Sequence, residues 1–252
     1  MHVMAINGSP RKERSSTSHI LGPLLEGMRA GGATTEVVHL GQVQIKPCLG
    51  CFLCWVKTPG KCVQQDDMAT VLERFVQADI LIFGTPLYHY AMSGLLKNFI
   101  DRTLPIHEPW MVEDPHHPGR STHPDRYPKD RAALLVSPCG FPEFNHFAPL
   151  VHYFQFYIQK LGWRYLGEIL RPAGNSLSGE QYQEMFTWYY DLVRQAGEQL
   201  IRQGQISPEV QAGLRRDLFP GGVETFRDEA NRHWAETMAK FGVTAKPPGQ
   251  RG

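Results

Sequence analysis

The residues whose types and spacing point most directly to chemistry are four cysteines in the stretch CLGCFLCWVKTPGKC (48–62). This stretch holds four of the five cysteines in the chain, in the pattern C-x2-C-x2-C-x7-C. Three cysteines at successive three-residue steps can surround one iron–sulfur cubane, and a fourth ligand can come from further along the chain. A structural zinc site usually takes two separated pairs instead. Cys48, Cys51, Cys54 and Cys62 are therefore candidate ligands of a [4Fe–4S] cluster.

The overall composition narrows the roles of these thiols. The formal net charge is +1, with 26 basic and 25 acidic side chains, which favours neither a nucleic-acid surface nor a polybasic membrane anchor. No apolar run approaches the roughly 20 residues that span a bilayer, and the start, MHVMAINGSPRK, lacks the pattern of a signal peptide. We therefore expect a cytoplasmic protein, where a cysteine cluster favours metal or redox chemistry over disulfides. The rival interpretation is a thiol-rich loop that packs beside another site or at a subunit interface.

A second chemical signal is the segment GSPRKERSST (8–17), which follows a short apolar stretch. It combines hydroxyl side chains near an expected helix start with backbone N–H groups and the basic side chain of Arg11. The start of a helix attracts anions because its first N–H groups are unpaired and the helix dipole is positive there. The P-loop and the dinucleotide-binding glycine fingerprint are both absent. The segment therefore predicts a site for one terminal monophosphate, and the alternative is a capped helix with solvated basic residues.

The elements that would position these segments follow from apolar patterning. Strands are expected at 2–7, 34–40, 79–84, 132–137 and 164–170, with helical spacing of apolar residues between them. This alternation predicts an α/β protein with a doubly wound parallel sheet. Ligands of such sheets bind beyond the carboxyl ends of the strands, at the topological switch point. The loops after the first, third and fourth strands are therefore the expected site.

Two of those loops have a distinctive composition. TPLYHYAMSG (85–94) places aromatic rings at the crevice, where a planar ring system could stack, and the alternative is an aromatic cluster at the edge of the core. SPCGFPEF (137–144) forms a small flexible turn that should lie beside it. The sequence thus predicts one crevice lined by three neighbouring loops.

Two other groups of side chains could look like metal ligands. Residues 105–131 contain six of the nineteen prolines and almost no apolar periodicity, so we expect a long loop or lid without strands or helices. The four histidines of this segment stand at no ligand spacing, which favours a surface lid over a metal site; they are His107, His116, His117 and His123. Asp66 and Asp67 stand at an expected helix start, which favours capping over metal binding.

The last third of the chain is expected to be helical. Ser178 and Gln181 resemble a capping box that begins one helix, and Gly204 ends it. Ser207 begins another helix, and a last one should cover 223–241. We therefore expect a domain over residues 1–172, including the lid, and a helical C-terminal extension over 173–252 packed on the same domain.

Three motifs in this order resemble a known family. They are the GSPRK loop with its following Ser-Thr, the four-cysteine segment ending in DDM, and GTPLYHYAMSGLLKNFIDR. The chain resembles NAD(P)H-dependent FMN reductases of the flavodoxin-like superfamily over about residues 1–170, in the branch that includes the iron–sulfur flavoproteins. The resemblance implies a five-stranded sheet in the order 2-1-3-4-5, with FMN at its edge and a homodimer or homotetramer that closes the flavin site.

The same resemblance implies which residues bind FMN. The phosphate would be held by Ser9, Arg11, Ser15, Ser16 and Thr17. The isoalloxazine ring would be lined by Pro86, Leu87, Tyr88 and His89, with a third wall from Ser137, Cys139 and Gly140. The nicotinamide of NAD(P)H would stack on the exposed flavin face. No side-chain acid or base is required for hydride transfer to a flavin, so no catalytic residue is assigned.

The leading functional hypothesis is an FMN-dependent NAD(P)H oxidoreductase that reduces a small acceptor such as a quinone, a flavin, or a nitro or azo compound. The alternative is an iron–sulfur flavoprotein that carries electrons from a ferredoxin-type donor, with the cluster on the segment 48–62. A third hypothesis is a flavin-binding interaction protein without turnover. Iron and sulfide content separate the first two, and negligible turnover with bound FMN would identify the third.

Overall fold

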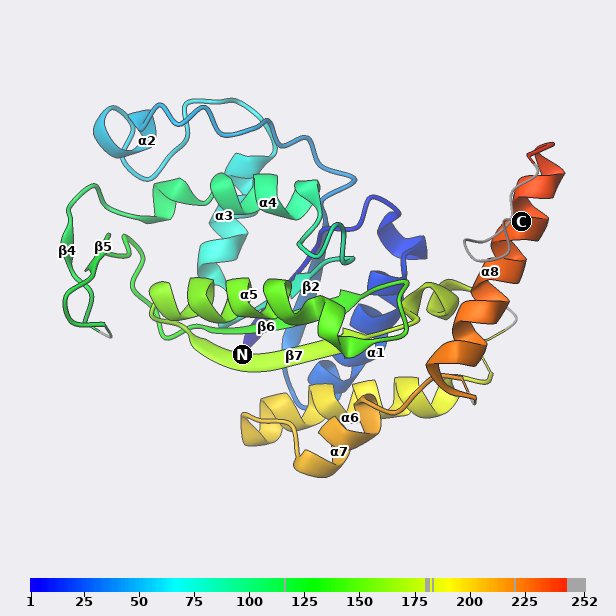
Figure 1. Cartoon of the computed structure of the whole chain (residues 1–252). Coiled ribbons are helices and arrows are strands. Elements are labelled where there is room, and N and C mark those ends of the chain that lie inside the picture. Colours follow the sequence, from blue (N-terminus) through cyan, green and yellow to red (C-terminus); the bar gives the residue numbers. More distant parts are fainter. Residues whose placement is uncertain (116, 180–181, 183, 220, 244–252) are drawn as a thin grey trace.

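The computed structural model describes residues 1–115, 117–179, 182, 184–219 and 221–243. Its centre is a five-stranded parallel sheet in the order β2-β1-β3-β6-β7 (Figure 1). The strands are β1 (His2–Asn7), β2 (Thr34–His39), β3 (Ile80–Gly84), β6 (Ala132–Pro138) and β7 (Arg164–Arg171). Numbered along the chain within this sheet, they have the order 2-1-3-4-5, which confirms the predicted flavodoxin-like α/β fold.

Helices cover both faces of the sheet because the central strands are apolar on both sides. Val3 and Ala5 point into one core and Met4 and Ile6 into the other, as the alternation of side chains along a strand requires. The first core includes α1 (Ser16–Ala30), α6 (Thr187–Gln203) and α7 (Pro208–Leu214). The second includes α3 (Met68–Gln77), α4 (Gly94–Asp101) and α5 (Ala148–Lys160). In both cores, buried side chains of the strands pack against buried side chains of the helices. This packing holds the ends of the loops that connect strands and helices.

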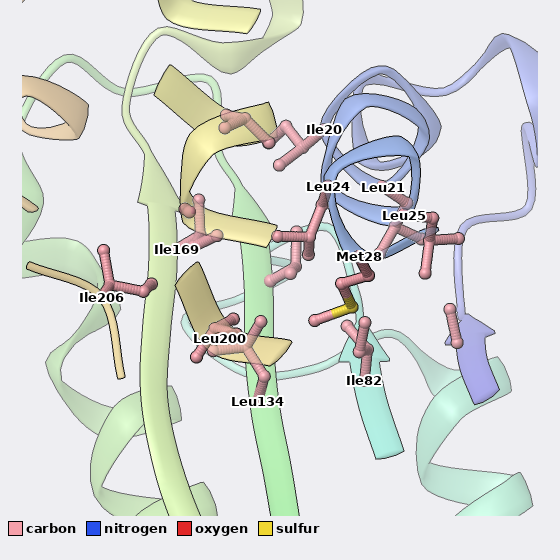
Figure 2. Close-up of a cluster of buried hydrophobic side chains, with 14 of the residues drawn as sticks. Ile20, Leu21, Leu24, Leu25, Met28, Ile82, Leu134, Ile169, Leu200 and Ile206 are labelled. Atoms are coloured by element: carbon pink, nitrogen blue, oxygen red, sulfur yellow. The ribbon is translucent and has the colours of Figure 1, made fainter. Parts of the chain in front are cut away.

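The crossing of α1 and α6 brings two backbones unusually close. A Cβ atom added at Gly27 would stand 1.8 Å from the carbonyl oxygen of Arg194, and one at Gly197 would stand 2.1 Å from that of Leu24. Only glycine fits at these two points. Figure 2 shows the side chains around this crossing, with Leu24 and Met28 of α1 near Leu200 of α6. The C-terminal helices therefore share a core with the first helix of the chain, while a domain boundary at residue 172 stays a prediction.

The C-terminal region differs from the prediction at its beginning. Ser178 ends a 3-10 helix (Gly174–Ser178), and α6 begins only at Thr187, so Ser178 does not start that helix. Gln181, the other half of the predicted capping box, lies outside the described residues. Gly204 ends α6 in the left-handed conformation, with φ 74°, as predicted.

The later helices follow the predicted signals. Ser207 begins α7, and its hydroxyl accepts a hydrogen bond from the N–H of Val210. The last helix is α8 (Gly222–Lys240). The guanidinium of Arg171, only 1% exposed at the end of β7, donates to the carbonyl oxygens of Leu214 and Arg216 at 3.1 and 2.9 Å. This buried cation fastens the segment after α7 to the edge of the sheet.

Two segments expected as loops contain short regular elements. The lid carries a two-stranded antiparallel ladder, β4 (Val112–Glu113) with β5 (Ser121–Thr122), so the expectation of no strand there is wrong. Asp114 is 2% exposed and forms an ion pair with Lys160 of α5, which gives the ladder an anchor that composition does not reveal. The cysteine segment likewise includes a one-turn helix, α2 (Leu53–Val56).

Within the described residues, every helix is too short or too polar to cross a lipid bilayer.

Candidate functional site

Three loops begin side by side at the carboxyl edge of the sheet. Asn7 at the end of β1 pairs in register with Gly84 at the end of β3, and Gly84 pairs with Val136 of β6. The chain after each of these strands leaves the sheet at the same level. The segments 8–17, 85–93 and 137–143 therefore lie side by side at the edge where the strand order predicts a crevice.

Hydrogen bonds between these loops hold them in one arrangement. The hydroxyl of Ser93 donates to the carbonyl oxygen of Gly8 at 2.6 Å, and its N–H donates to the hydroxyl of Thr85 at 2.9 Å. The hydroxyl of Ser137 donates to the carbonyl oxygen of Thr85 at 2.8 Å. Thr85, which no sequence pattern singled out as a site residue, thus joins the loops after β3 and β6. The crevice is preorganised before any ligand arrives.

The first loop is shaped by a cap and by a buried asparagine. The hydroxyl of Ser15 accepts from the N–H of Ser18 at 3.1 Å and donates to the carbonyl oxygen of Lys12 at 2.6 Å. Asn7, fully buried, accepts from the N–H of Ser9 at 2.9 Å and donates to the hydroxyl of Ser18 at 2.7 Å. The Ser15 hydroxyl is therefore occupied in capping α1. Asn7 and Ser18 are organising residues that the sequence interpretation missed.

The start of α1 keeps several donors free. The hydroxyl of Thr17 is buried and has no hydrogen-bond partner in the described part of the chain. The N–H groups of Ser16 and Thr17 precede the first helical hydrogen bond, which runs from His19 N–H to the Ser15 carbonyl. A buried hydroxyl without a partner is costly unless a ligand completes it. These donors, with the exposed guanidinium of Arg11 nearby in sequence, fit a phosphate group.

The second loop makes a strained two-residue turn. Tyr88 and Ala91 exchange two backbone hydrogen bonds of 2.9 Å, and the two residues between them have positive φ, 46° at His89 and 63° at Tyr90. Bulky residues rarely adopt this left-handed conformation, and tight turns of this kind prefer asparagine and glycine. Such strain is typical of sites where a loop must present particular groups to a ligand. Here it brings His89 and Tyr90 to the edge of the crevice.

A cavity of about 560 Å³ lies against this turn. Its size is that of a pocket for a cofactor or a drug-sized ligand. One wall comes from Leu87, His89, Cys139 and Gly140, four of the residues predicted to line a flavin ring. Another part of the lining comes from α8, a helix that no motif connected with the site. The cavity thus brings together loops predicted from the sequence and a helix that was not.

His146 and Glu143 also contribute to the site beside the cavity, and the sequence interpretation missed both. The ring of His146 lies 4.5 Å from that of Phe141 and 5.8 Å from that of Tyr90, measured between centroids. Its Nε2 is 3.2 Å from the carboxylate of Glu143, which accepts a hydrogen bond of 3.0 Å from Arg227 of α8. That bond from Arg227 is the main reason why the pKa of Glu143 is lowered. Loop and helix are therefore linked by an ion pair next to the cavity.

The four clustered cysteines line a separate, small pocket. Cys48 and Cys51 are exposed, Cys54 is buried, Cys62 is intermediate, and all four face this pocket together. Burial raises the pKa of Cys54, and the other three sulfurs nearby raise it further. Among the described residues, no group of three or more potential ligands is arranged to hold a metal ion. The four thiols are the donor set of an iron–sulfur cluster.

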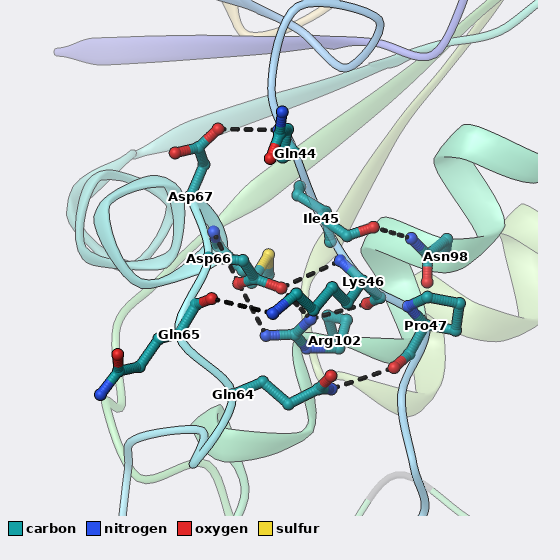
Figure 3. Close-up of polar contacts among 11 residues, drawn as sticks. Gln44, Ile45, Lys46, Pro47, Gln64, Gln65, Asp66, Asp67, Asn98 and Arg102 are labelled. Carbon is teal, nitrogen blue, oxygen red and sulfur yellow. Dashed lines mark hydrogen bonds and ion pairs between the residues drawn. The ribbon is translucent and has the colours of Figure 1, made fainter.

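A buried ion pair holds the cysteine segment to the rest of the fold. Arg102, 2% exposed, donates to both carboxylate oxygens of Asp66, at 2.6 and 3.0 Å, and to the carbonyl oxygen of Lys46 at 2.6 Å. Figure 3 shows these contacts, together with the bond from Asn98 to Ile45. Asp66 also accepts from the N–H of Met68, the first residue of α3, so it contributes to the start of the helix as predicted. The entry to the cysteine segment and its exit are thereby fixed to α4.

The five cysteines should differ in how fast they react with a thiol reagent. In protein freed of iron by a chelator, we expect brief iodoacetamide treatment to label Cys48 and Cys51 and to spare Cys139. The thiolate is the reactive form, and burial raises the pKa of Cys139 to about 11. Peptide mass spectrometry measures the labelling, and denatured protein provides the control in which all five react. Equal labelling rates for Cys139 and Cys48 in the native protein would contradict the buried position.

Comparison with known proteins agrees with this geometry. Residues 1–115 match the family described as NADPH-dependent FMN reductase. An iron-sulfur flavoprotein of Archaeoglobus fulgidus is 40% identical over 103 residues, which is 41% of this chain and 49% of the relative. An iron-sulfur flavoprotein of Methanocaldococcus jannaschii is 36% identical over 106 residues, 42% of this chain and 53% of the relative. The chain thus spans about half the length of these curated relatives.

Solved structures agree on the fold. An FMN-dependent NADH-azoreductase from Bacillus anthracis, in complex with FMN, superposes with a TM-score of 0.55 and 16% identity, over 79% of this chain and 99% of that one. RosB with a bound flavin-phosphate intermediate gives a TM-score of 0.56 and 16% identity, over 92% of this chain and 87% of that one. At such identities the likeness shows the fold alone. The first 115 residues therefore match the NADPH-dependent FMN reductase family by sequence on a flavodoxin-like fold, which confirms the resemblance predicted from the sequence.

Proposed function

We propose that this protein is an FMN-dependent oxidoreductase that uses NAD(P)H to reduce a small electron acceptor. The observation that carries the proposal is the start of α1, where the Thr17 hydroxyl is buried and has no partner among the described residues. The methyl carbon of Thr17 would stand 3.0 Å from a Cβ added at Gly84, the last residue of β3. A phosphate there and a planar ring between the loops after β3 and β6 match the two ends of FMN. The names of the matched relatives and the family match of residues 1–115 support it.

The chain's own groups have separate tasks in this proposal. Thr17 and the first N–H groups of α1 hold the phosphate, and the turn at His89–Tyr90 with Cys139–Gly140 encloses the ring. FMN, when bound, supplies the hydride and electron chemistry. The protein would position the cofactor and exclude water from it with the walls of the cavity. Burial keeps the Cys139 thiol protonated at neutral pH, so it is a neutral wall and not a nucleophile.

The proposal is tested by adding FMN to the purified protein and following NADH or NADPH oxidation with a quinone acceptor. Bound FMN and turnover that depends on it are expected. The protein should bind FMN at least 100-fold more tightly than riboflavin. Only FMN carries a phosphate that can accept hydrogen bonds from the Thr17 hydroxyl and the first N–H groups of α1. Equal affinity for riboflavin would contradict the phosphate site, and absence of FMN binding would overturn the proposed function.

Replacing Thr17 should weaken FMN binding specifically. A hydrogen bond to a charged group contributes about 1.5–3 kcal/mol, so we expect Thr17→Val to raise the Kd for FMN by about 10-fold or more. Fluorescence titration measures the Kd, and circular dichroism checks that the variant folds. Thr70→Val, at an exposed position of α3, is the matched control and should bind like wild type. A Kd for Thr17→Val within twofold of wild type would assign the phosphate elsewhere.

The second candidate is an electron carrier with a [4Fe–4S] cluster on Cys48, Cys51, Cys54 and Cys62. The convergence of the four thiols on one pocket favours it, as do the relatives named iron-sulfur flavoproteins. Anaerobic purification with iron and sulfide assays separates the candidates. The carrier hypothesis predicts about four iron and four sulfide per chain, and reduction by ferredoxin but not by NAD(P)H. This result would favour the electron carrier over the reductase. For both candidates we propose a cytoplasmic location and a homodimer or homotetramer. Light scattering of the purified protein would test the oligomeric state.

A further inference from the structure

The helix α8 lies beside the crevice although it stands outside the family match and far from the loops in sequence. Its cavity-lining residues are Phe226, Arg227, Ala230, Asn231 and Trp234. Positions separated by three and four residues share one face of a helix. One face of α8 therefore forms a wall of the cavity that the loops after β3 and β6 also line. Figure 1 shows α8 running along the end of the fold, apart from the sheet.

Two contacts fix this wall in place. At the start of α8, the ring of Phe226 lies 5.8 Å from that of Phe219, which in turn lies 5.4 Å from the buried ring of Phe186. Further along, Arg227 donates to Glu143 of the loop after β6 at 3.0 Å. The helix is thus attached both to the core and to the crevice.

Among the described residues, little covers the side chain of Trp234, whose ring meets that of His233 at 5.8 Å between centroids. Trp234 is 58% exposed although it lines the cavity, and α8 has no buried residue. A tryptophan offers a large planar face for stacking on another ring. The same cavity is lined by Leu87, His89 and Cys139–Gly140, the predicted ring wall. It could therefore hold a planar aromatic molecule against Trp234, next to the residues that would line the flavin ring.

The charges at the cavity narrow the class of that molecule. The cation of Arg227 is paired with Glu143, and the other residues that α8 contributes are neutral. His89 and Tyr90 are the only other titratable groups on the walls besides the protonated Cys139, among the described residues. A neutral lining of aromatic and amide groups favours an uncharged ligand over an anion, because desolvating an unpaired charge is costly.

We propose that α8 is the acceptor-binding wall of this enzyme and that Trp234 selects uncharged planar aromatic acceptors. The inference rests on the proposed function and deepens it, since it assigns the substrate class to residues outside the family match. Trp234 contacts the acceptor and takes no part in FMN phosphate binding. Removing this side chain should therefore weaken binding of the acceptor and leave the affinity for FMN unchanged.

The test compares menadione, an uncharged bicyclic quinone, with ferricyanide, a compact anion that does not stack. For Trp234→Ala we expect the KM for menadione to rise about 10-fold, because the acceptor loses both its stacking partner and the buried area of the indole. The KM for ferricyanide should stay within twofold, and the Kd for FMN should be unchanged. Trp234→Phe should keep most of the wild-type affinity. Phe241→Ala is the matched control, because Phe241 is an exposed aromatic residue just beyond α8 that does not line the cavity.

Measuring the binding of menadione directly tests the role of Trp234 without relying on enzyme turnover. Calorimetric titration of menadione into the oxidised, FMN-loaded protein should show a Kd that weakens about 10-fold in Trp234→Ala. Unchanged Kd and KM for menadione in that variant would overturn the role of α8 while FMN-dependent ferricyanide reduction upheld the proposed function. Loss of FMN binding by the wild-type protein would overturn the proposed function itself.

Discussion

Replacing Gly27 with alanine should lower the free energy of unfolding by about 3 kcal/mol, since overpacking a tight contact costs typically 1–3 kcal/mol and here the contact is backbone. The new methyl group would stand 1.8 Å from the carbonyl oxygen of Arg194 and 2.8 Å from its carbonyl carbon. A flexible side chain could turn away, but a helix backbone must move as a whole. The crossing of α1 and α6 would have to widen, and the core beneath it would lose contacts.

The effect is measured by urea denaturation followed by circular dichroism. Gly22→Ala in the same helix is the control, because nothing lies within 4 Å of a Cβ added there. It should raise the free energy of unfolding by roughly 0.5–1 kcal/mol, the usual gain from replacing a helical glycine. Gly197→Ala, on the partner helix, should behave like Gly27→Ala. Equal stability of Gly27→Ala and Gly22→Ala would show that the helices do not cross this closely.

Removing the carboxylate charge of Asp66 should also have a large effect. In Asp66→Asn the guanidinium of Arg102 remains buried without its counter-charge, and breaking such a pair costs about 3–5 kcal/mol. The variant should also expose the cysteine segment, because the pair fixes Lys46 at its entry. Denaturation measures the first effect, and faster iodoacetamide labelling of Cys54, which is buried in the wild type, measures the second.

Asp101→Asn is the matched control, since Asp101 pairs with Lys97 at a half-exposed position one helical turn away. Its expected cost is about 0.5 kcal/mol or less. If Asp66→Asn were no more destabilising than this control, the ion pair would not be buried in solution.

The Asp66 pair also predicts a pH dependence. Burial alone would raise the pKa of Asp66, but hydrogen bonds from Arg102 and from the Lys46 N–H outweigh it and lower the pKa overall. A lowered pKa means that the carboxylate stabilises the fold above its unfolded pKa of about 3.9 and loses this contribution as the pH falls through the folded value. The stability difference between wild type and Asp66→Asn should therefore be constant above about pH 5 and shrink below about pH 4.

The strands of the sheet could be predicted because each is a continuous apolar run. His2–Asn7 agrees with β1, and the runs beginning at 79 and 132 agree with β3 and β6 within two residues. Both faces of these strands are buried, so their sequences carry a strong signal. Gly204 and Ser207 were equally informative, because a left-handed helix end and a helix cap demand particular residue types.

The parts that were missed depend on contacts that sequence patterns do not contain. Asn7, Thr85 and Ser18 are ordinary polar residues whose importance comes from the hydrogen bonds they make across loops. The β4–β5 ladder is two residues long in each strand and is held by the ion pair of Asp114 with Lys160, 46 residues away. The wall from α8 depends on Arg227 meeting Glu143 across 84 residues.

The buried guanidinium of Arg171 has a consequence for the order in which the chain is synthesised. Both carbonyl groups that accept its hydrogen bonds come 43 and 45 residues later. While the ribosome is still making that stretch, the outer strand of the sheet has been made but its cation has neither acceptor. Because a buried cation without acceptors is strongly unfavourable, the edge of the sheet can close only after the helices beyond it have emerged. The outer strand β7 therefore takes its final place only after the C-terminal helices have emerged, and folding is completed late in translation.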